Sequence, residues 1–270
     1  MTAAPPAEQE VDTLTAPLTE LLRLDRIDQG LFRSTHVVEA DRPLYGGQVV
    51  AQALMACGLT VEEGRDPHSL HGYFLRRGDA GRRVIFRVAN DRDGRSYSAR
   101  RVVAIQDGAV ILTMSCSFRT LTEGAERTKS EIAPLVDPEE CRTIPAGPDI
   151  ALEARVQDWP TAEQYFPTKF WVRPNCALPE NDSLAHAAAI AYMTDFSAGL
   201  SRVHGSEILG PSLDHAVWFH RTPCWNDWLL VDYGAGVAAG KRGWYPGSVV
   251  DGNGEVVASL TQEMVYTDKR

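Results

Sequence analysis

Two stretches of this chain, LHGYFLRR at residues 70–77 and DHAVWFHR at residues 214–221, align with each other without a gap. A second pair, GAVILT at residues 108–113 and GEVVAS at residues 254–259, follows in the same order. The first residues of the paired stretches are 144 and 146 positions apart (70 to 214 and 108 to 254). Each match is weak alone, but two ordered matches at nearly one offset indicate an internal duplication.

Both halves show the same order of expected elements. Apolar runs at residues 48–61 and 183–196 are longer than a typical strand and rich in Ala, which predicts helices. The first run is apolar on nearly all sides, so that helix must be buried on most sides. Strands are expected at residues 68–76, 83–90, 96–106 and 109–120, and again at 169–173, 214–221, 228–233, 240–250 and 255–267. The simplest packing is an α+β fold in which a curled antiparallel sheet wraps around a central helix, twice.

The duplication divides the chain into four parts. Residues 1–20 are expected to form a flexible leader, and residues 21–120 the first sheet-and-helix unit. Residues 121–167 are rich in Pro and acidic residues and have no clear period, which is typical of a connector. Residues 168–270 form the second unit, which we expect to carry the active site.

Composition excludes several classes of function. The chain has 270 residues, 44% hydrophobic and 23% charged, as in an ordinary globular protein, and its net charge of −9 argues against nucleic acid as a partner. No apolar run approaches the ~20 residues of a membrane helix, and the N-terminus lacks the features of a secretory signal. The five cysteines are widely spaced without a CxxC pair, which predicts neither a disulfide framework nor a zinc site. We therefore expect a cytoplasmic protein without a metal.

Several motifs resemble the acyl-CoA thioesterase II family. They are GLFR at residues 30–33, GGQVVAQAL at 46–54, DGRSYSARRV at 93–102, LDHAVWFHR at 213–221 and VASLTQE at 257–263. The resemblance extends from about residue 22 to the C-terminus. It implies two tandem hotdog units (a double hotdog) and hydrolysis of acyl-CoA to free fatty acid and coenzyme A. It also implies no cofactor beyond the coenzyme A of the substrate, and a homodimer or homotetramer.

The same resemblance implies that an Asp, a Thr or Ser, and a Gln hold the attacking water. The Asp position corresponds to Asp214 and the Gln position to Gln262. The hydroxyl position falls on Gly236, and no Ser or Thr occurs between residues 231 and 242. The sequence therefore predicts a thioesterase of reduced efficiency.

The residues themselves support one active site per chain. Gln262 lies on an otherwise apolar face of its expected strand, where an unpaired amide would cost about 1–3 kcal/mol, so it needs a partner. Its counterpart in the first half is Cys116, and that of Asp214 is Leu70. A structural role common to both halves would not predict this asymmetry. A backbone hydrogen bond for Gln262, and an ion pair or solvent for Asp214, remain the alternatives.

Thioester hydrolysis assigns a role to each candidate. Asp214 is the expected base and Gln262 the residue that orients the water. Gly46 and Gly47 open the first helix and could bring backbone N–H groups close to the thioester carbonyl, although glycines there can also serve packing alone. Asp195, inside the second predicted helix, is a rival carboxylate for which a surface or capping role is expected.

Basic residues at positions 76, 77, 82 and 83, and at 95, 100 and 101, could meet the phosphates of coenzyme A or could be solvated strand edges. Two other functions remain open. A protein that binds acyl-CoA without turnover is the first, because the expected hydroxyl is missing at Gly236. An acyl-CoA hydratase on the same fold is the second, but the chain lacks a Gly-Asp-x-Asn-Pro-type motif, and its first helix has no acid before Glu62.

Overall fold

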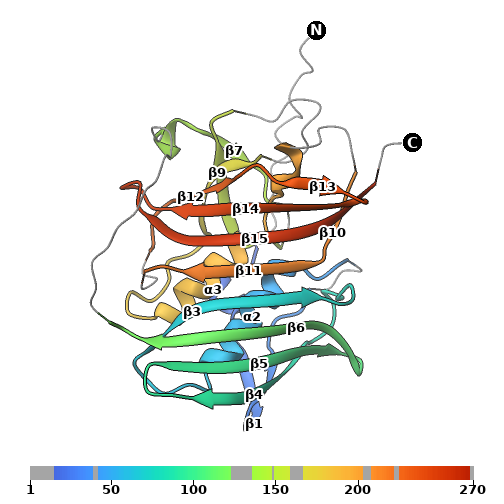
Figure 1. The fold of residues 1–270 in the computed structure, drawn as a ribbon, viewed down its shortest axis with the longest axis vertical. Coiled ribbons are helices and arrows are strands. Elements are labelled where there is room, and N and C mark those ends of the chain that lie inside the picture. The colour runs from blue at the N-terminus through green and yellow to red at the C-terminus, as the bar shows by residue number, and fades with distance from the viewer. Residues whose placement is uncertain are drawn as a thin grey trace.

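The computed structural model describes residues 15–38, 42–122, 136–147, 149–158, 167–202, 208–221 and 225–267. Two hotdog units join edge to edge, so that the strands form one long antiparallel sheet (Figure 1). The elements of the first unit are α1 (Leu18–Leu21), β1 (Leu24–Asp28), β2 (Leu31–Ser34), α2 (Gly46–Gly58), β3 (Arg65–Phe74), β4 (Ile85–Asp93), β5 (Tyr97–Gln106) and β6 (Ala109–Thr120). Those that follow are η1 (Pro138–Glu140), β7 (Arg142–Ile144), β8 (Leu152–Val156), β9 (Lys169–Pro174), α3 (Ser183–Met193), η2 (Gly199–Arg202), β10 (Ile208–Ser212), β11 (Asp214–Phe219), β12 (Leu229–Tyr233), β13 (Val237–Ala239), β14 (Arg242–Val250) and β15 (Val256–Thr267).

The strand order shows the predicted duplication directly. It runs β1-β2-β4-β5-β6-β3 in the first unit and β11-β15-β14-β12-β9-β8-β7 in the second. The repeated stretches lie on β3 and β11, which pair with each other at the centre of the sheet, Leu70 opposite Val217 and Gly72 opposite His215. An approximate two-fold axis therefore passes between these two strands, and the predicted double hotdog is confirmed.

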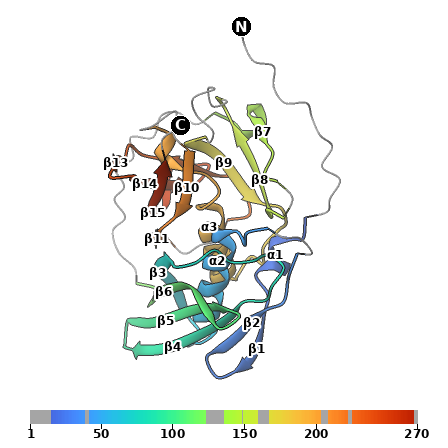
Figure 2. The ribbon, with the colours of Figure 1, turned by 90° about the vertical axis from the view of Figure 1, so that its right-hand side faces the viewer.

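The two long helices lie side by side, and the sheet curls around them (Figure 2). They run antiparallel and touch through glycines. A Cβ atom on Gly47 would collide with the carbonyl oxygen of Tyr192, and one on Gly58 would collide with the side chain of Leu184. The start of α2 therefore lies against the end of α3.

Both helices are shorter than their apolar runs predict. α2 ends at Gly58 and α3 at Met193, three residues before the end of each run. Asp182 caps α3 by accepting a hydrogen bond from the Ala185 N–H at 2.9 Å. Asp195 therefore lies beyond the helix, two residues after its last turn, and the expectation that it is a helix residue is wrong.

Two expected boundaries differ in the structure. The range predicted to be a connector contains β7 and β8, which extend the second unit's sheet by pairing next to β9. The expected leader includes the start of α1, whereas residues 1–14 lie outside the described residues. No helix within the described ranges has both the length and the apolarity that crossing a bilayer requires.

Candidate functional site

Gln262 is the buried centre of a polar cluster beyond the end of α3. As predicted, it projects from the inward face of β15, and its side chain is 1% exposed. Its Nε2 donates to Asp195 Oδ1 at 2.6 Å and to Ser212 Oγ at 2.9 Å. Its Oε1 accepts a hydrogen bond from the Tyr245 hydroxyl. The side chains of Asp195, Ser212 and Tyr245 thus provide the hydrogen-bond partners that this buried amide was expected to need.

Asp195 supplies the carboxylate of this cluster. Besides Gln262, it accepts a hydrogen bond from the backbone of Gly47, at the start of α2. Burial raises the pKa of this carboxyl from 3.8 to about 6, against the opposing effect of the two hydrogen bonds. A carboxyl that titrates near neutral pH can both accept and return a proton, as a general base must.

Ser212 supplies the hydroxyl. It ends β10, which pairs with the last part of β15 and places Ser212 opposite Met264. Because Ser212 Oγ accepts from Gln262, its own proton remains available to a further acceptor. An acid, an amide and a hydroxyl therefore converge from the segment after α3, from β15 and from β10.

The structure does not bring Asp214 into this cluster. Its Oδ1 accepts from the backbone N–H of Glu263 at 2.6 Å, and among the described contacts no hydrogen bond joins it to Gln262. Partial burial raises the pKa of Asp214, so this carboxyl is also perturbed. We expected Asp214 to hold the water together with Gln262, but the carboxylate that contacts Gln262 is that of Asp195.

Gly236 does not occupy the hydroxyl position. It lies between β12 and β13, and a Cβ atom there would collide with the carbonyl oxygen of Trp244. Ser212 provides the hydroxyl that was expected at this position. The hydroxyl beside Gln262 is therefore that of Ser212, and residue 236 is not needed to supply one.

Gly46 and Gly47 open the first long helix, as the sequence predicted. They form the first turn of α2 beside Asp195, and a Cβ atom on Gly46 would lie 2.6 Å from Asp195 Oδ2. Tyr45, the N-cap residue, makes no side-chain cap. The absence of a side chain at Gly46 therefore lets the Asp195 carboxylate lie close to the backbone at the start of α2.

Sequence reasoning missed Asp195 and Ser212 as partners of Gln262. One signal was present, because Asp195 is the only acidic residue between Asp182 and Glu207 and follows a mostly apolar helix. Ser212 gave a weaker signal, since only the pairing of β10 with β15 places it near Gln262.

One residue proposed for coenzyme A phosphates is excluded. Arg100 is 1% exposed and donates to Thr60 Oγ1 and Asp93 Oδ1, each at 2.8 Å. It cannot reach a ligand from solvent.

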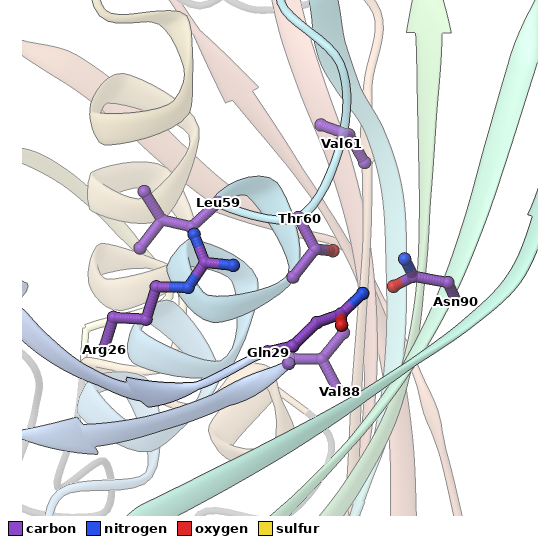
Figure 3. A pocket seen from close by; sticks show the side chains of 8 residues that line it. Arg26, Gln29, Leu59, Thr60, Val61, Val88 and Asn90 are labelled. Atoms are coloured by element: carbon purple, nitrogen blue, oxygen red, sulfur yellow. The ribbon is translucent and has the colours of Figure 1, made fainter.

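A separate pocket of about 390 Å³ opens in the first unit, beyond the end of α2 (Figure 3). It is lined by Arg26, Gln29, Gly30, Leu59, Thr60, Val61, Val88 and Asn90. This lining contains a cation and two amides but no acid that could activate water. The pocket is therefore not the candidate site for hydrolysis.

Comparison with known proteins identifies the family of the chain. A family model described as the acyl-CoA thioesterase N-terminal domain matches residues 39–119, and one described as the C-terminal domain matches residues 133–266. Acyl-CoA thioesterase 2 of Haemophilus influenzae is 31% identical over 91% of this chain and 95% of its own. Human acyl-coenzyme A thioesterase 8 is 29% identical over 96% of this chain and 91% of its own.

Solved structures give the same result. The acyl-CoA thioesterase II TesB2 of Mycobacterium marinum superposes with a TM-score of 0.74 at 31% identity, covering 93% of this chain and 97% of its own. A hot dog fold protein from Alicyclobacillus acidocaldarius has a TM-score of 0.78 at 19% identity over 94% of this chain and 98% of its own, which supports the fold alone. The chain belongs to the acyl-CoA thioesterase II family of double hotdog thioester hydrolases.

Proposed function

We propose that this protein hydrolyses acyl-CoA thioesters with a water molecule held by Asp195, Ser212 and Gln262. The observation that carries the proposal is the pair of hydrogen bonds from the Gln262 amide to a carboxylate and to a hydroxyl. The carboxylate has a pKa of about 6, which suits a base at neutral pH. Family membership supplies the substrate class.

Asp195 acts as the general base in this proposal. It takes a proton from the water as the water oxygen bonds to the thioester carbonyl carbon. The tetrahedral intermediate then collapses, the carbon–sulfur bond breaks, and Asp195 returns the proton to the coenzyme A thiolate. The products are the fatty acid and free coenzyme A, and no cofactor is consumed.

Gln262 and Ser212 prepare this base and its water. The Gln262 N–H stabilises the ionised form of Asp195, and its second N–H holds the Ser212 oxygen. The Ser212 proton is thereby directed away from Gln262, toward the water. With the acid, the amide and the hydroxyl all present, the reduced efficiency predicted from Gly236 loses its basis, and so does the main reason to favour a protein that only binds acyl-CoA.

The start of α2 is the proposed site for the thioester carbonyl. Backbone N–H groups at a helix N-terminus stabilise the negative charge that develops on the carbonyl oxygen. The Gly47 backbone already binds Asp195, so Gly46 is the expected donor. Contact of the other basic residues with the phosphates of coenzyme A remains a prediction, and so does the assembly of the chain into dimers or tetramers.

The test compares Asp195→Asn with Asp214→Asn by measuring free thiol released from acyl-CoA of short to long chain length. We expect Asp195→Asn to lose at least about 10²-fold in kcat, since a positioned base contributes roughly 10²–10⁴-fold. Asp214→Asn should stay within a few-fold of wild type, because an Asn oxygen can still accept from Glu263. The opposite pattern would restore Asp214 as the base. Acyl-CoA binding by wild type without thiol release at any chain length would establish the non-catalytic alternative.

A further inference from the structure

The amide of Gln262 has two different ends, and Tyr245 contacts the end that faces away from Asp195. A glutamine amide donates from nitrogen and accepts at oxygen, and its two orientations have nearly the same shape. Only the orientation with Nε2 toward Asp195 and Ser212 gives both of them a donor. Ionised Asp195 favours this orientation because it can only accept, but protonated Asp195 does not, so a further group is needed to favour it over the flipped form at that stage.

The Tyr245 hydroxyl can act as that group because Gln262 Oε1 is the one described acceptor of its proton. Tyr245 lies on β14, directly opposite Gln262 on β15, and is 0% exposed. Its oxygen accepts a hydrogen bond from the backbone of Gly199, at the start of η2, and its proton goes to Gln262 Oε1. Burial and the nearby Asp195 raise the pKa of Tyr245, so the hydroxyl stays protonated.

The ring of Tyr245 is held in place by its surroundings. Tyr233 packs edge-on against it with the ring centroids 5.2 Å apart. A Cβ atom on Gly199 would lie 2.5 Å from Tyr245 Cδ2, so the ring fits only because residue 199 is a glycine. The hydroxyl is therefore positioned before any substrate arrives.

On the basis of the function proposed above, we propose that Tyr245 is a positioning residue that fixes which end of the Gln262 amide faces Asp195. The need is greatest after Asp195 has taken the proton from water. A protonated Asp195 can donate to Oε1 of a flipped Gln262, which would hold the proton that the thiolate needs and remove the donor from Ser212. In that flipped form Nε2 would meet the Tyr245 O–H, donor against donor. Tyr245 thus makes the flipped form unfavourable throughout the cycle.

The test is Tyr245→Phe, which removes the hydroxyl and keeps the ring. We expect kcat to fall about five- to tenfold, the value of one hydrogen bond of about 1 kcal/mol, with KM within twofold. The acid limb of the kcat–pH profile should also move to higher pH, because a flipped Gln262 stabilises protonated Asp195. A merely structural role for Tyr245 would not move this limb.

Tyr192→Phe is the matched control. Its hydroxyl is also buried, but it accepts from the Ala151 N–H and makes no described hydrogen bond to Gln262. We expect a comparable loss of thermal stability with the acid limb unmoved. If both variants shift the limb equally, the effect is general loosening and the proposal fails.

A double-mutant cycle with Gln262→Ala provides the second measurement. If Tyr245 acts through Gln262, adding Tyr245→Phe to Gln262→Ala should change kcat less than twofold. A further five- to tenfold loss would overturn the proposal. If the wild-type protein hydrolyses acyl-CoA and Tyr245→Phe has the same kcat and pH profile, the role of Tyr245 is refuted and the proposed function is not. A wild-type protein without hydrolysis refutes the proposed function itself.

Discussion

The two hotdog units place different residues at equivalent positions, and only one set can do chemistry. On β5 and β6, Arg100 lies opposite Cys116, whereas on β14 and β15 the equivalent pair is Tyr245 and Gln262. Each pair faces the residue two positions beyond the end of its helix. That residue is Thr60 after α2 and Asp195 after α3.

In the first unit this arrangement is structural, and we call the hydrogen bonds of Arg100 to Thr60 and Asp93 the brace. The buried guanidinium of Arg100 donates to the hydroxyl and the carbonyl of Thr60 and to Asp93, so it ties the segment after α2 to the sheet. In the second unit the same place holds a chain of hydrogen bonds that ends on a carboxylate with a pKa of about 6. Both units therefore place hydrogen-bonded polar side chains here, whereas the function proposed for the second unit also requires a group that can gain and lose a proton.

The largest effect is expected at the hydroxyl of the second unit. Ser212→Ala should lower kcat about 10²–10³-fold, as the loss of one positioned donor does at comparable sites. Ser212→Thr keeps the hydroxyl and should retain most of the activity. Thiol release under saturating substrate checks both variants. Near-wild-type turnover by Ser212→Ala would remove Ser212 from the site.

The brace of the first unit should respond in stability rather than in rate. Arg100→Met removes a buried charge and leaves its partners without a donor, which should lower the free energy of unfolding by about 3 kcal/mol. Urea unfolding measures this change. At a temperature where the variant is folded, kcat should stay within about threefold of wild type. A large loss of kcat in fully folded Arg100→Met would show that the two units are not separable in this way.

Asp195→Asn should change stability in the opposite direction. The carboxyl pKa is about 6 in the folded chain against 3.8 as its ordinary value, so the ionised form is destabilising above pH 6 and this cost is absent below pH 3.8. A shift of roughly 2 units corresponds to ~3 kcal/mol at most, and since the amide loses some hydrogen bonding we expect a gain of about 1–2 kcal/mol at pH 8. Unfolding at pH 8 and pH 4 checks this, with no gain expected at pH 4. A loss of stability at pH 8 would contradict the conclusion that the ionised Asp195 carboxylate destabilises the folded chain.

The last prediction concerns the pH dependence of the unaltered protein. The base must be ionised, so kcat should fall tenfold for each pH unit below about 6 and level off above it. A pH profile of thiol release on the wild-type protein measures this limb. A limb near pH 4 would mean that the catalytic carboxyl is not the buried one.

The sequence predicted the duplication, the two buried helices and the inward position of Gln262, because all three depend on periodicity and spacing. It did not predict the partner of Gln262. Periodicity does not show where an apolar helix ends, and the three residues after Met193 decide whether Asp195 is inside α3 or beyond it.

Ser212 could not be predicted for a different reason. The pairing of β10 with β15 shifts register between Leu209 and Ser212. Such irregularities re-aim a side chain and leave little trace in the sequence pattern. The motif residue Asp214, two positions later, therefore received the role that we now propose for Asp195.

The glycine contact between α2 and α3 has a consequence for how such a chain can arise. Asp195 comes from the second unit, but the helix start that it binds comes from the first, so neither unit alone contains a complete centre. A single unit would have to associate with a copy of itself, and symmetry would then force two identical centres on the pair. Covalent fusion releases that constraint, because the two units can then carry different residues at equivalent positions, as Arg100 and Cys116 differ from Tyr245 and Gln262.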